Sequence, residues 1–409
     1  MLIEEIKSIF LNEGQEMQTK TPYIFTPWNR GGSWPTYDQR LLLKACLLEG
    51  ETALKAWHEW KASIDFDSLE TGSRRMLPLL FQNLKKHHVS DPLMEKMKGI
   101  YRYTWSKNQL LVRNFIPALE TFTQAGIKTI ILKGWALILH YYKDYGLRPM
   151  NDIDCLVRKQ DAYKAFHVMQ TLDWYSRIIQ IEKFHDLDNT PLKALHFNNS
   201  SGGEIDLHWR SLYMNINSQL DHYFWEGAVP VQIENNAVYL LNPADQLIHT
   251  CAHGIIWNRL APFRWIADAA VILRNSNPGI NWDDFISKIL KLRLILELKY
   301  SLTYLKMLLD IPIPLYVTDT LNDCYLSKRE KREFYIHTHK VRKMLGSLFI
   351  RWRIYRHQSQ ENQSKLRHFL GFIPFLKTGW QIKSWWVFPV ILLLKIVERV
   401  LSIVGIVKK

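Results

Sequence analysis

Two aspartates separated by a single residue lie inside the apolar run DIDCLV, residues 152–157. The run is short and apolar, so it predicts a buried β-strand. Side chains on a strand alternate between its two faces, so Asp152 and Asp154 share one face. Ile153 and Cys155 point the other way, into a core. Two like charges on one face of a mostly buried strand repel strongly, so the fold must place positive charge against them.

A later segment repeats this arrangement. In GEIDLHW, residues 203–209, the side chains of Glu204, Asp206 and His208 alternate with apolar ones and share one face. If the two strands are neighbours, Asp206 joins the two earlier aspartates. Carboxylate oxygens suit Mg²⁺ or Mn²⁺, and a pair of ions roughly 3.5–4 Å apart can clamp both oxygens of an in-line phosphoryl displacement. The three acids therefore predict a divalent metal site with two ions.

A phosphate site is expected close by, in ILKGWAL. Here a strand ends at Lys133 and Gly134, and a helix begins at Trp135. The first turn of a helix presents unpaired N–H groups and the positive end of the dipole, and glycine lets the backbone approach a phosphate. Lys133 or Arg148 can pair with phosphate charge. We predict nucleotide binding at these four residues.

Strand and helix patterns mix only in residues 121–241, whereas the regions before and after them have helical periodicity. The strands are expected at 127–132, 152–157, 193–199 and 203–209, with a further hairpin in 229–241, and a helix at 135–145. A single long helix is expected from Asn281 to Leu309. The predicted fold class is α+β, with a small mixed sheet between helical flanks. The expected regions are 1–120 (helical), 121–241 (α/β core), 242–325 (helical cleft wall) and 326–409 (basic and helical).

The basic excess of the chain is confined to its C-terminal part. From Ser327 onward there are 18 Lys and Arg residues and four Glu, and 18 − 4 = 14 equals the net charge of the whole chain. Such a region attracts phosphates, nucleic acid, an anionic membrane or an acidic protein, although a solvated helix surface is an equally good interpretation.

The last segment, from Trp385, has ten apolar residues before Lys395. A membrane-spanning helix needs roughly 20. The polar residues that follow recur at three- and four-residue spacing, which favours an amphipathic helix on a membrane surface or in a protein groove. We therefore expect peripheral membrane or protein contact through residues 380–409. Four widely separated cysteines and an N-terminus without a secretory signal predict a cytoplasmic protein, peripheral to the inner face of the membrane.

The motifs ILKGWAL, GLRPMNDIDCLV and EIDLHW together resemble the uncharacterised bacterial nucleotidyltransferase family of the DNA polymerase beta superfamily. Flanking segments such as LPLLFQNLKK and NPADQLIHTCAHG extend the resemblance over residues 35–310. It implies a palm-like sheet in which the first two acids, Asp152 and Asp154, bind both metals and the third, Asp206, binds one. The superfamily usually has Gly-Ser or Gly-Gly at the helix start, where this chain has Gly134 and Trp135.

Other polar residues near the expected cleft are candidates for contact with the acceptor. His208 shares the face of Asp206, and Asp268 lies in an apolar helix, either paired with Arg264 or acting as a general base. His253 is expected at a helix end facing the cleft or hydrogen-bonded in the core. A zinc site with His249 and Cys251 is disfavoured, because no fourth ligand is evident.

These residues together predict transfer of a nucleoside monophosphate from an NTP to an acceptor hydroxyl or phosphate, with release of pyrophosphate. The acceptor can be a small molecule, a protein or an RNA. Two alternatives remain open. One is a nucleotidyltransferase-like toxin or enzyme that modifies protein or tRNA, and the other is a nucleotide-binding scaffold without catalysis.

Overall fold

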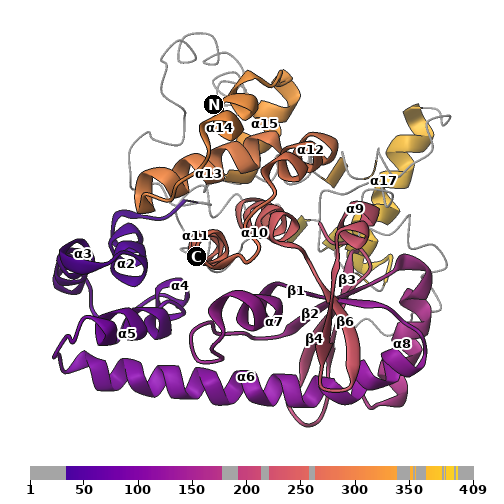
Figure 1. Ribbon diagram of the computed structural model, residues 1–409. Coiled ribbons are helices and arrows are strands. Elements are labelled where there is room, and N and C mark those ends of the chain that lie inside the picture. The colour runs from indigo at the N-terminus through magenta and orange to yellow at the C-terminus, as the bar shows by residue number, and fades with distance from the viewer. Residues whose placement is uncertain are drawn as a thin grey trace.

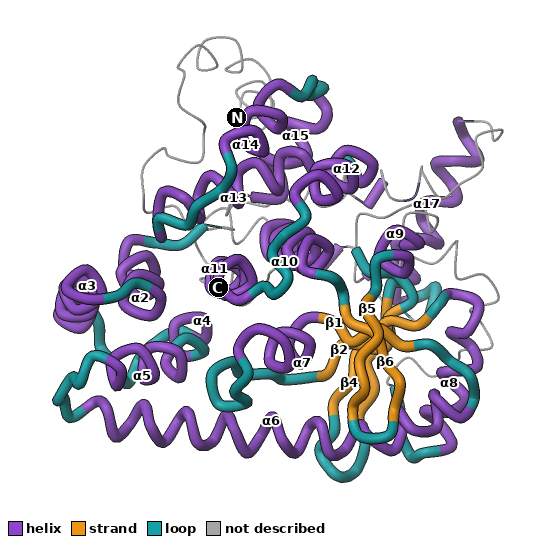
Figure 2. The backbone as a smooth tube through the Cα atoms, viewed as in Figure 1, coloured by secondary structure: helices purple, strands orange, loops and turns teal. Residues whose placement is uncertain are grey.

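The computed structural model describes residues 34–176, 192–212, 221–257 and 263–338, together with short segments between 351 and 394. In this part of the chain, one mixed β-sheet lies beside a larger group of helices (Figures 1 and 2). The α+β prediction is confirmed. The division into four regions stays a prediction, which limited proteolysis can test.

The helices before the sheet form from amphipathic segments with clear start signals. Thr36 and Gln39 make a reciprocal capping box at the first described helix. The longest helix, α6, runs under this group and continues below the sheet (Figure 1). It thus joins the helical part to the strands. The bounds are α2 Tyr37–Leu47, α3 Gly50–Ser63, α4 Thr71–Arg74, α5 Leu77–Lys86 and α6 Leu93–Gln124.

The sheet has the strand order β3-β4-β2-β1-β6-β5. Three pairs are antiparallel, β1 with β2, β3 with β4 and β5 with β6, while β1–β6 and β2–β4 are parallel. Every expected strand and both expected hairpins are present. The bounds are β1 Thr129–Leu132, β2 Ile153–Val157, β3 Ala194–Asn198, β4 Glu204–His208, β5 Val229–Ile233 and β6 Asn236–Leu240.

Two helical predictions differ from the structure. The helix after β1 is α-helical only over Lys133–Leu137 (α7) and continues as a π-helical turn over Ile138–Tyr142. The single helix expected over 281–309 is two helices, because Arg293 has a left-handed backbone with φ of 55° and ends the first. The remaining bounds are α8 Ala162–Thr171, α9 His222–Glu226, α10 Pro243–Trp257, α11 Arg264–Asn275, α12 Trp282–Leu292, α13 Ile295–Leu309, α14 Leu315–Asp323, α15 Lys328–Thr338 and α17 Lys365–Gly379.

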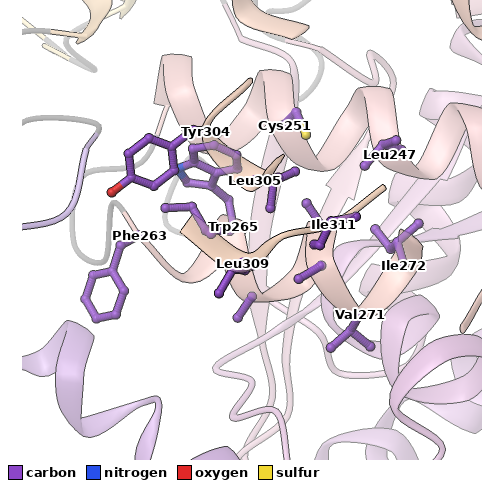
Figure 3. Close-up of a cluster of buried hydrophobic side chains, with 14 of the residues drawn as sticks. Leu247, Cys251, Phe263, Trp265, Val271, Ile272, Tyr304, Leu305, Leu309 and Ile311 are labelled. Carbon is purple, nitrogen blue, oxygen red and sulfur yellow. The ribbon is translucent and has the colours of Figure 1, made fainter. Parts of the chain in front are cut away.

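Two hydrophobic cores meet at the sheet. The larger unites the helices before the sheet with α10 to α14, and part of it, around Cys251 and Trp265, is shown in Figure 3. The smaller lies between the other sheet face and helices α6 and α8. Strand β1 belongs to both, because Ile130 and Leu132 point into the larger core and Ile131 into the smaller. Because the side chains of β1 alternate between the two faces of the sheet, this strand contributes to both cores.

The described C-terminal residues carry exposed apolar side chains. Trp386 is 91% exposed, and Trp385, Val387, Val390, Leu393 and Leu394 are also exposed. Among the described helices, none combines the length and the apolar character needed to cross a membrane. Most of the 380–409 segment lies outside the described residues, so the amphipathic helix expected there stays a prediction.

Candidate functional site

The three predicted carboxylates come from two neighbouring parallel strands. Asp154 on β2 and Asp206 on β4 are direct partners in the register. Asp152 lies immediately before the first residue of β2. Ile153 and Cys155 are fully buried on the opposite face, as their alternation predicts. The expectation that the two strands are neighbours is therefore confirmed, and the three acids share one end of one sheet face.

Positive charge faces Asp154 directly. The Lys133 ammonium lies 2.5 Å from Asp154 Oδ1, and His208 Nε2 lies 2.9 Å from the same oxygen. Burial opposes ionisation of Asp154, but Lys133 and His208 outweigh it and hold the pKa of Asp154 well below its usual range. Burial, together with the charge of Lys133, lowers the pKa of His208. Asp154 is therefore an ionised carboxylate whose two contacts are both made by Oδ1.

Asp152 has a different environment. It has no hydrogen-bond or ion-pair partner within the described part of the chain, and burial with the charges of Asp154 and Asp206 raises its pKa to about 7. Asp206, in contrast, pairs with His196, whose Nδ1 lies 2.8 Å from Asp206 Oδ1. That hydrogen bond outweighs burial and lowers the pKa of Asp206, and it raises the pKa of His196. Asp154 and Asp206 thus have partners that offset the repulsion between like charges expected from the sequence, whereas Asp152 has none in the described residues.

The turn from β1 into α7 brings the backbone close to this cluster. Lys133 adopts a left-handed conformation with φ of 46°, which is uncommon for a residue with a side chain. A Cβ at Gly134 would lie 2.7 Å from Met150 Sδ and 2.9 Å from Arg148 Nη1, so any other residue would displace these two side chains. Trp135 is fully buried and packs edge-on against Phe115. Its indole is a core group, which leaves only its backbone to face a ligand.

Arg148 is held in a fixed orientation next to Gly134. Its Nε and Nη2 donate to the two carboxylate oxygens of Asp268 at 2.8 and 2.9 Å, and Tyr142 also donates to Asp268 at 2.8 Å. Burial disfavours the charge of Asp268, but Arg148 outweighs it and keeps the pKa of Asp268 low. The ion pair expected for Asp268 exists, but its partner is Arg148. The expected pairing with Arg264 is wrong, because the Arg264 guanidinium donates to the Pro149 carbonyl.

Two further arginines lie near Arg148: Arg75, which the sequence did not single out, and Arg264, which it named only as a possible partner of Asp268. Burial lowers the pKa of Arg75, and the charge of Arg148 lowers it further, while Asp152 opposes the shift. Burial and the charge of Arg148 lower the pKa of Arg264 to about 10. Three guanidinium groups thus influence one another, and two carboxylates act on them: Asp268 on Arg148 and Arg264, and Asp152 on Arg75. These three cations make the region beside Gly134 basic.

The histidines of α10 lie on the same side of the sheet as the acids. His249 Nε2 is 3.2 Å from the Ser211 carbonyl, and the rings of His249 and His253 stack with their centroids 5.9 Å apart. The Nε2 atom of His253 is buried without a hydrogen-bond partner in the described residues. Cys251 projects away from both, into the apolar cluster of Figure 3.

Two groups of side chains within the described ranges have donor atoms close enough to share a metal ion. One is Asp152, His196 and Asp206, and the other is Asp154, Asp206 and His208, with all donor atoms of a group within 4.8 Å of one another. Asp206 belongs to both. Carboxylate and imidazole donors fit a divalent cation. The residues present therefore fit the two ions that the sequence predicts.

Comparison with protein families decides the class of protein. The model of a family described as uncharacterised nucleotidyltransferases matches residues 72–310. This chain belongs to that family of nucleotidyltransferases. A crystal structure of an antigenic nucleotidyltransferase-like protein from Paracoccidioides brasiliensis is similar at 14% identity, with a TM-score of 0.32, over 51% of this chain and 95% of that chain. Comparison with curated protein sequences gives no match.

The segment that matches the family contains every residue of this nucleotidyltransferase that the sequence placed in the site. His196 lies in it too and was missed, although a signal existed. The hairpin that joins β3 to β4 pairs His196 with Asp206. A register deduced from the turn would have put an imidazole opposite the third acid.

Proposed function

We propose that this nucleotidyltransferase is metal-dependent and transfers a nucleoside monophosphate from an NTP to an acceptor, releasing pyrophosphate. The observation that carries the proposal is the convergence of Asp152, Asp154 and Asp206 on two parallel neighbouring strands. Carboxylates so arranged are typical of sites that hold divalent ions, and such ions neutralise the charge of a transferring phosphoryl group. The membership of the DNA polymerase beta superfamily is part of this proposal.

The three aspartates would hold two divalent ions, Mg²⁺ or Mn²⁺. When bound, such ions would neutralise the negative charge on the phosphate oxygens and on the leaving pyrophosphate. The side chains of the protein do the positioning. Lys133, His208 and His196 keep Asp154 and Asp206 ionised, and hydrogen bonds hold these carboxylates toward one end of the sheet.

The triphosphate would lie beside Gly134 and the start of α7. Glycine there lets the Arg148 guanidinium and the Met150 side chain pack directly against the backbone, and Asp268 fixes Arg148 in this place. Lys133, Arg75 and the backbone of Trp135 complete this positive region. Asp268 acts in this arrangement as a positioning residue, because both of its oxygens accept from Arg148.

The acceptor would approach from the side of α10. His253 offers a buried ring nitrogen without a partner in the described residues, and His208 lies next to Asp154. Either can contact an acceptor hydroxyl or phosphate. In-line attack on the α-phosphorus forms the bond to the acceptor oxygen as the bond to pyrophosphate breaks, and a hydroxyl acceptor also gives up its proton to a nearby base or to solvent. Holding the acceptor opposite the leaving pyrophosphate would supply part of the rate.

Labelling tests the proposal directly. The full-length protein is incubated with each α-³²P-labelled NTP, ATP first, together with a host lysate and Mg²⁺ or Mn²⁺. The expected result is a labelled small molecule, protein or RNA, which then identifies the acceptor. The matched control is the double variant Asp152→Asn with Asp154→Asn, which should label nothing. Equal labelling by both proteins would refute the catalytic assignment, and NTP binding without labelling would support a scaffold instead.

We further propose that the protein is cytoplasmic and contacts the inner face of the membrane through residues 380–409. Exposed Trp385 and Trp386 next to apolar side chains suit the interface of a bilayer. The surplus of Lys and Arg beyond Ser327 suits anionic lipid headgroups. Sedimentation with anionic liposomes tests this, and binding to a protein partner in place of lipid would redirect the proposal.

A further inference from the structure

His196 lies beside the three acids, and the metal site predicted from the sequence gives it no role. It lies on β3 directly opposite Asp206 in the register. Its Nδ1 points at Asp206 Oδ1 from 2.8 Å, and together with Asp152 these side chains form one of the two groups able to hold a metal ion. Asp152, the third member, has no other partner in the described residues. The imidazole thus completes a three-donor set.

The other nitrogen of His196 faces a fourth acid. His196 Nε2 lies 3.9 Å from Glu204 Oε2, which belongs to the first residue of β4. Histidines that bind metals usually donate their second ring N–H to a carboxylate, which fixes the tautomer and the direction of the ring. The 3.9 Å between Nε2 and Glu204 is longer than a hydrogen bond, but it places a carboxylate on the side of Nε2 while Nδ1 is directed at Asp206.

The accessibility of this group also suits a nucleotide site. The side chains of His196 and Asp206 are 44% and 29% exposed. The second group is more enclosed, since Asp154 is 6% and His208 1% exposed, and Asp154 already faces the Lys133 ammonium. An ion held by His196 would therefore keep open coordination positions for phosphate oxygens. His208, in contrast, is buried and already contacts Asp154.

We propose that metal binding displaces the proton shared by His196 Nδ1 and Asp206 into solvent, that Nδ1 becomes a direct metal ligand with Glu204 on the side of Nε2, and that this ligand gives the site a preference for Mn²⁺ over Mg²⁺. The inference rests on the proposed metal-dependent function. Magnesium prefers oxygen donors in a near-ideal octahedron, whereas an imidazole donor suits transition metals. Replacing one oxygen ligand by nitrogen should therefore favour manganese.

The test detects the atom that binds the metal and does not depend on enzyme activity. Mn²⁺ is bound to the full-length protein and examined by pulsed electron paramagnetic resonance, which detects the coupling of manganese to a directly bound nitrogen. Labelling the histidines with ¹⁵N should change that coupling. His196→Asn should abolish it and lower Mn²⁺ affinity by about 10-fold or more, with a smaller change for Mg²⁺. Glu204→Gln should weaken Mn²⁺ binding while the coupling remains.

His208→Asn is the matched control, because His208 also lies beside the acids but is assigned to Asp154. It should keep the nitrogen coupling. No coupling in the unmodified protein, no Mn²⁺ binding, or a coupling lost only in His208→Asn would overturn the inference. Its failure is separable from that of the proposed function. Label transfer without nitrogen coupling overturns only the ligand role of His196, and coupling without label transfer overturns only the catalytic role.

Discussion

Substitution of Asp268 by asparagine removes the charge that holds Arg148, and the structure gives the size of the effect. The two side chains are 7% and 5% exposed, so water screens their interaction little. Breaking a buried ion pair by removing one partner costs about 3–5 kcal/mol, because the other charge stays buried without compensation. Asparagine keeps one acceptor oxygen, so we expect a loss of about 3 kcal/mol, near the lower end of that range.

Urea unfolding of the wild type and of Asp268→Asn measures this loss as a fall in the free energy of unfolding. Asp319→Asn is the matched control, because Asp319 is exposed and has no described partner, and it should change that free energy by less than about 0.5 kcal/mol. Adding Arg148→Met to Asp268→Asn should recover much of the loss, since no charge is then left unpaired. Equal stability of Asp268→Asn and the control would refute the reasoning.

The same ion pair predicts a dependence of stability on pH. The pKa of Asp268 is lower in the folded protein than its ordinary value of about 3.9. The pair therefore contributes its full stability above about pH 4, and that contribution is lost as the pH falls through the lower folded value. The difference in unfolding free energy between the wild type and Asp268→Asn should shrink in acid. A difference that stays constant down to pH 2 would contradict the assignment.

Three further predictions concern the nucleotide site and the C-terminal surface. Gly134→Ala should lower the free energy of unfolding by about 1–3 kcal/mol and weaken ATP binding in calorimetry, because the added carbon would lie 2.7 Å from the nearest sulfur. Arg75→Ala should lower ATP affinity by about 10-fold without changing stability, while Arg102→Ala, on the exposed face of α6, should change neither. The double variant Trp385→Ser with Trp386→Ser should sediment less with anionic liposomes. Unchanged sedimentation would exclude these two residues from the contact.

The strands and the acid site follow from local sequence patterns. Alternation in DIDCLV and GEIDLHW fixes which side chains share a face, and the turn between the later strands fixes their pairing. The glycine at 134 follows from the strand-to-helix junction. These features depend on short-range rules that a single sequence displays.

Features that depend on tertiary contacts do not follow from such rules. Spacing along a helix suggested Arg264 as the partner of Asp268, but the actual partner, Arg148, lies 120 residues away in the chain. The break at Arg293 was missed because a left-handed residue there is not a glycine. Arg75 follows α4 and comes near Arg148 and Asp152, which lie more than 70 residues later in the chain, only in the folded protein.

Both hydrophobic cores are built from segments that lie far apart in the chain, and this has a practical consequence for dividing it. A cut at the exposed turn around Ser201 would leave Asp152 and Asp154 on one fragment and Asp206 on the other. Neither fragment would contain a complete core, because the larger core is formed by residues from both sides of the cut. The two pieces should remain inactive apart and regain the site only by reassembling, so the fold is suited to a split enzyme whose activity reports the association of two fused partners.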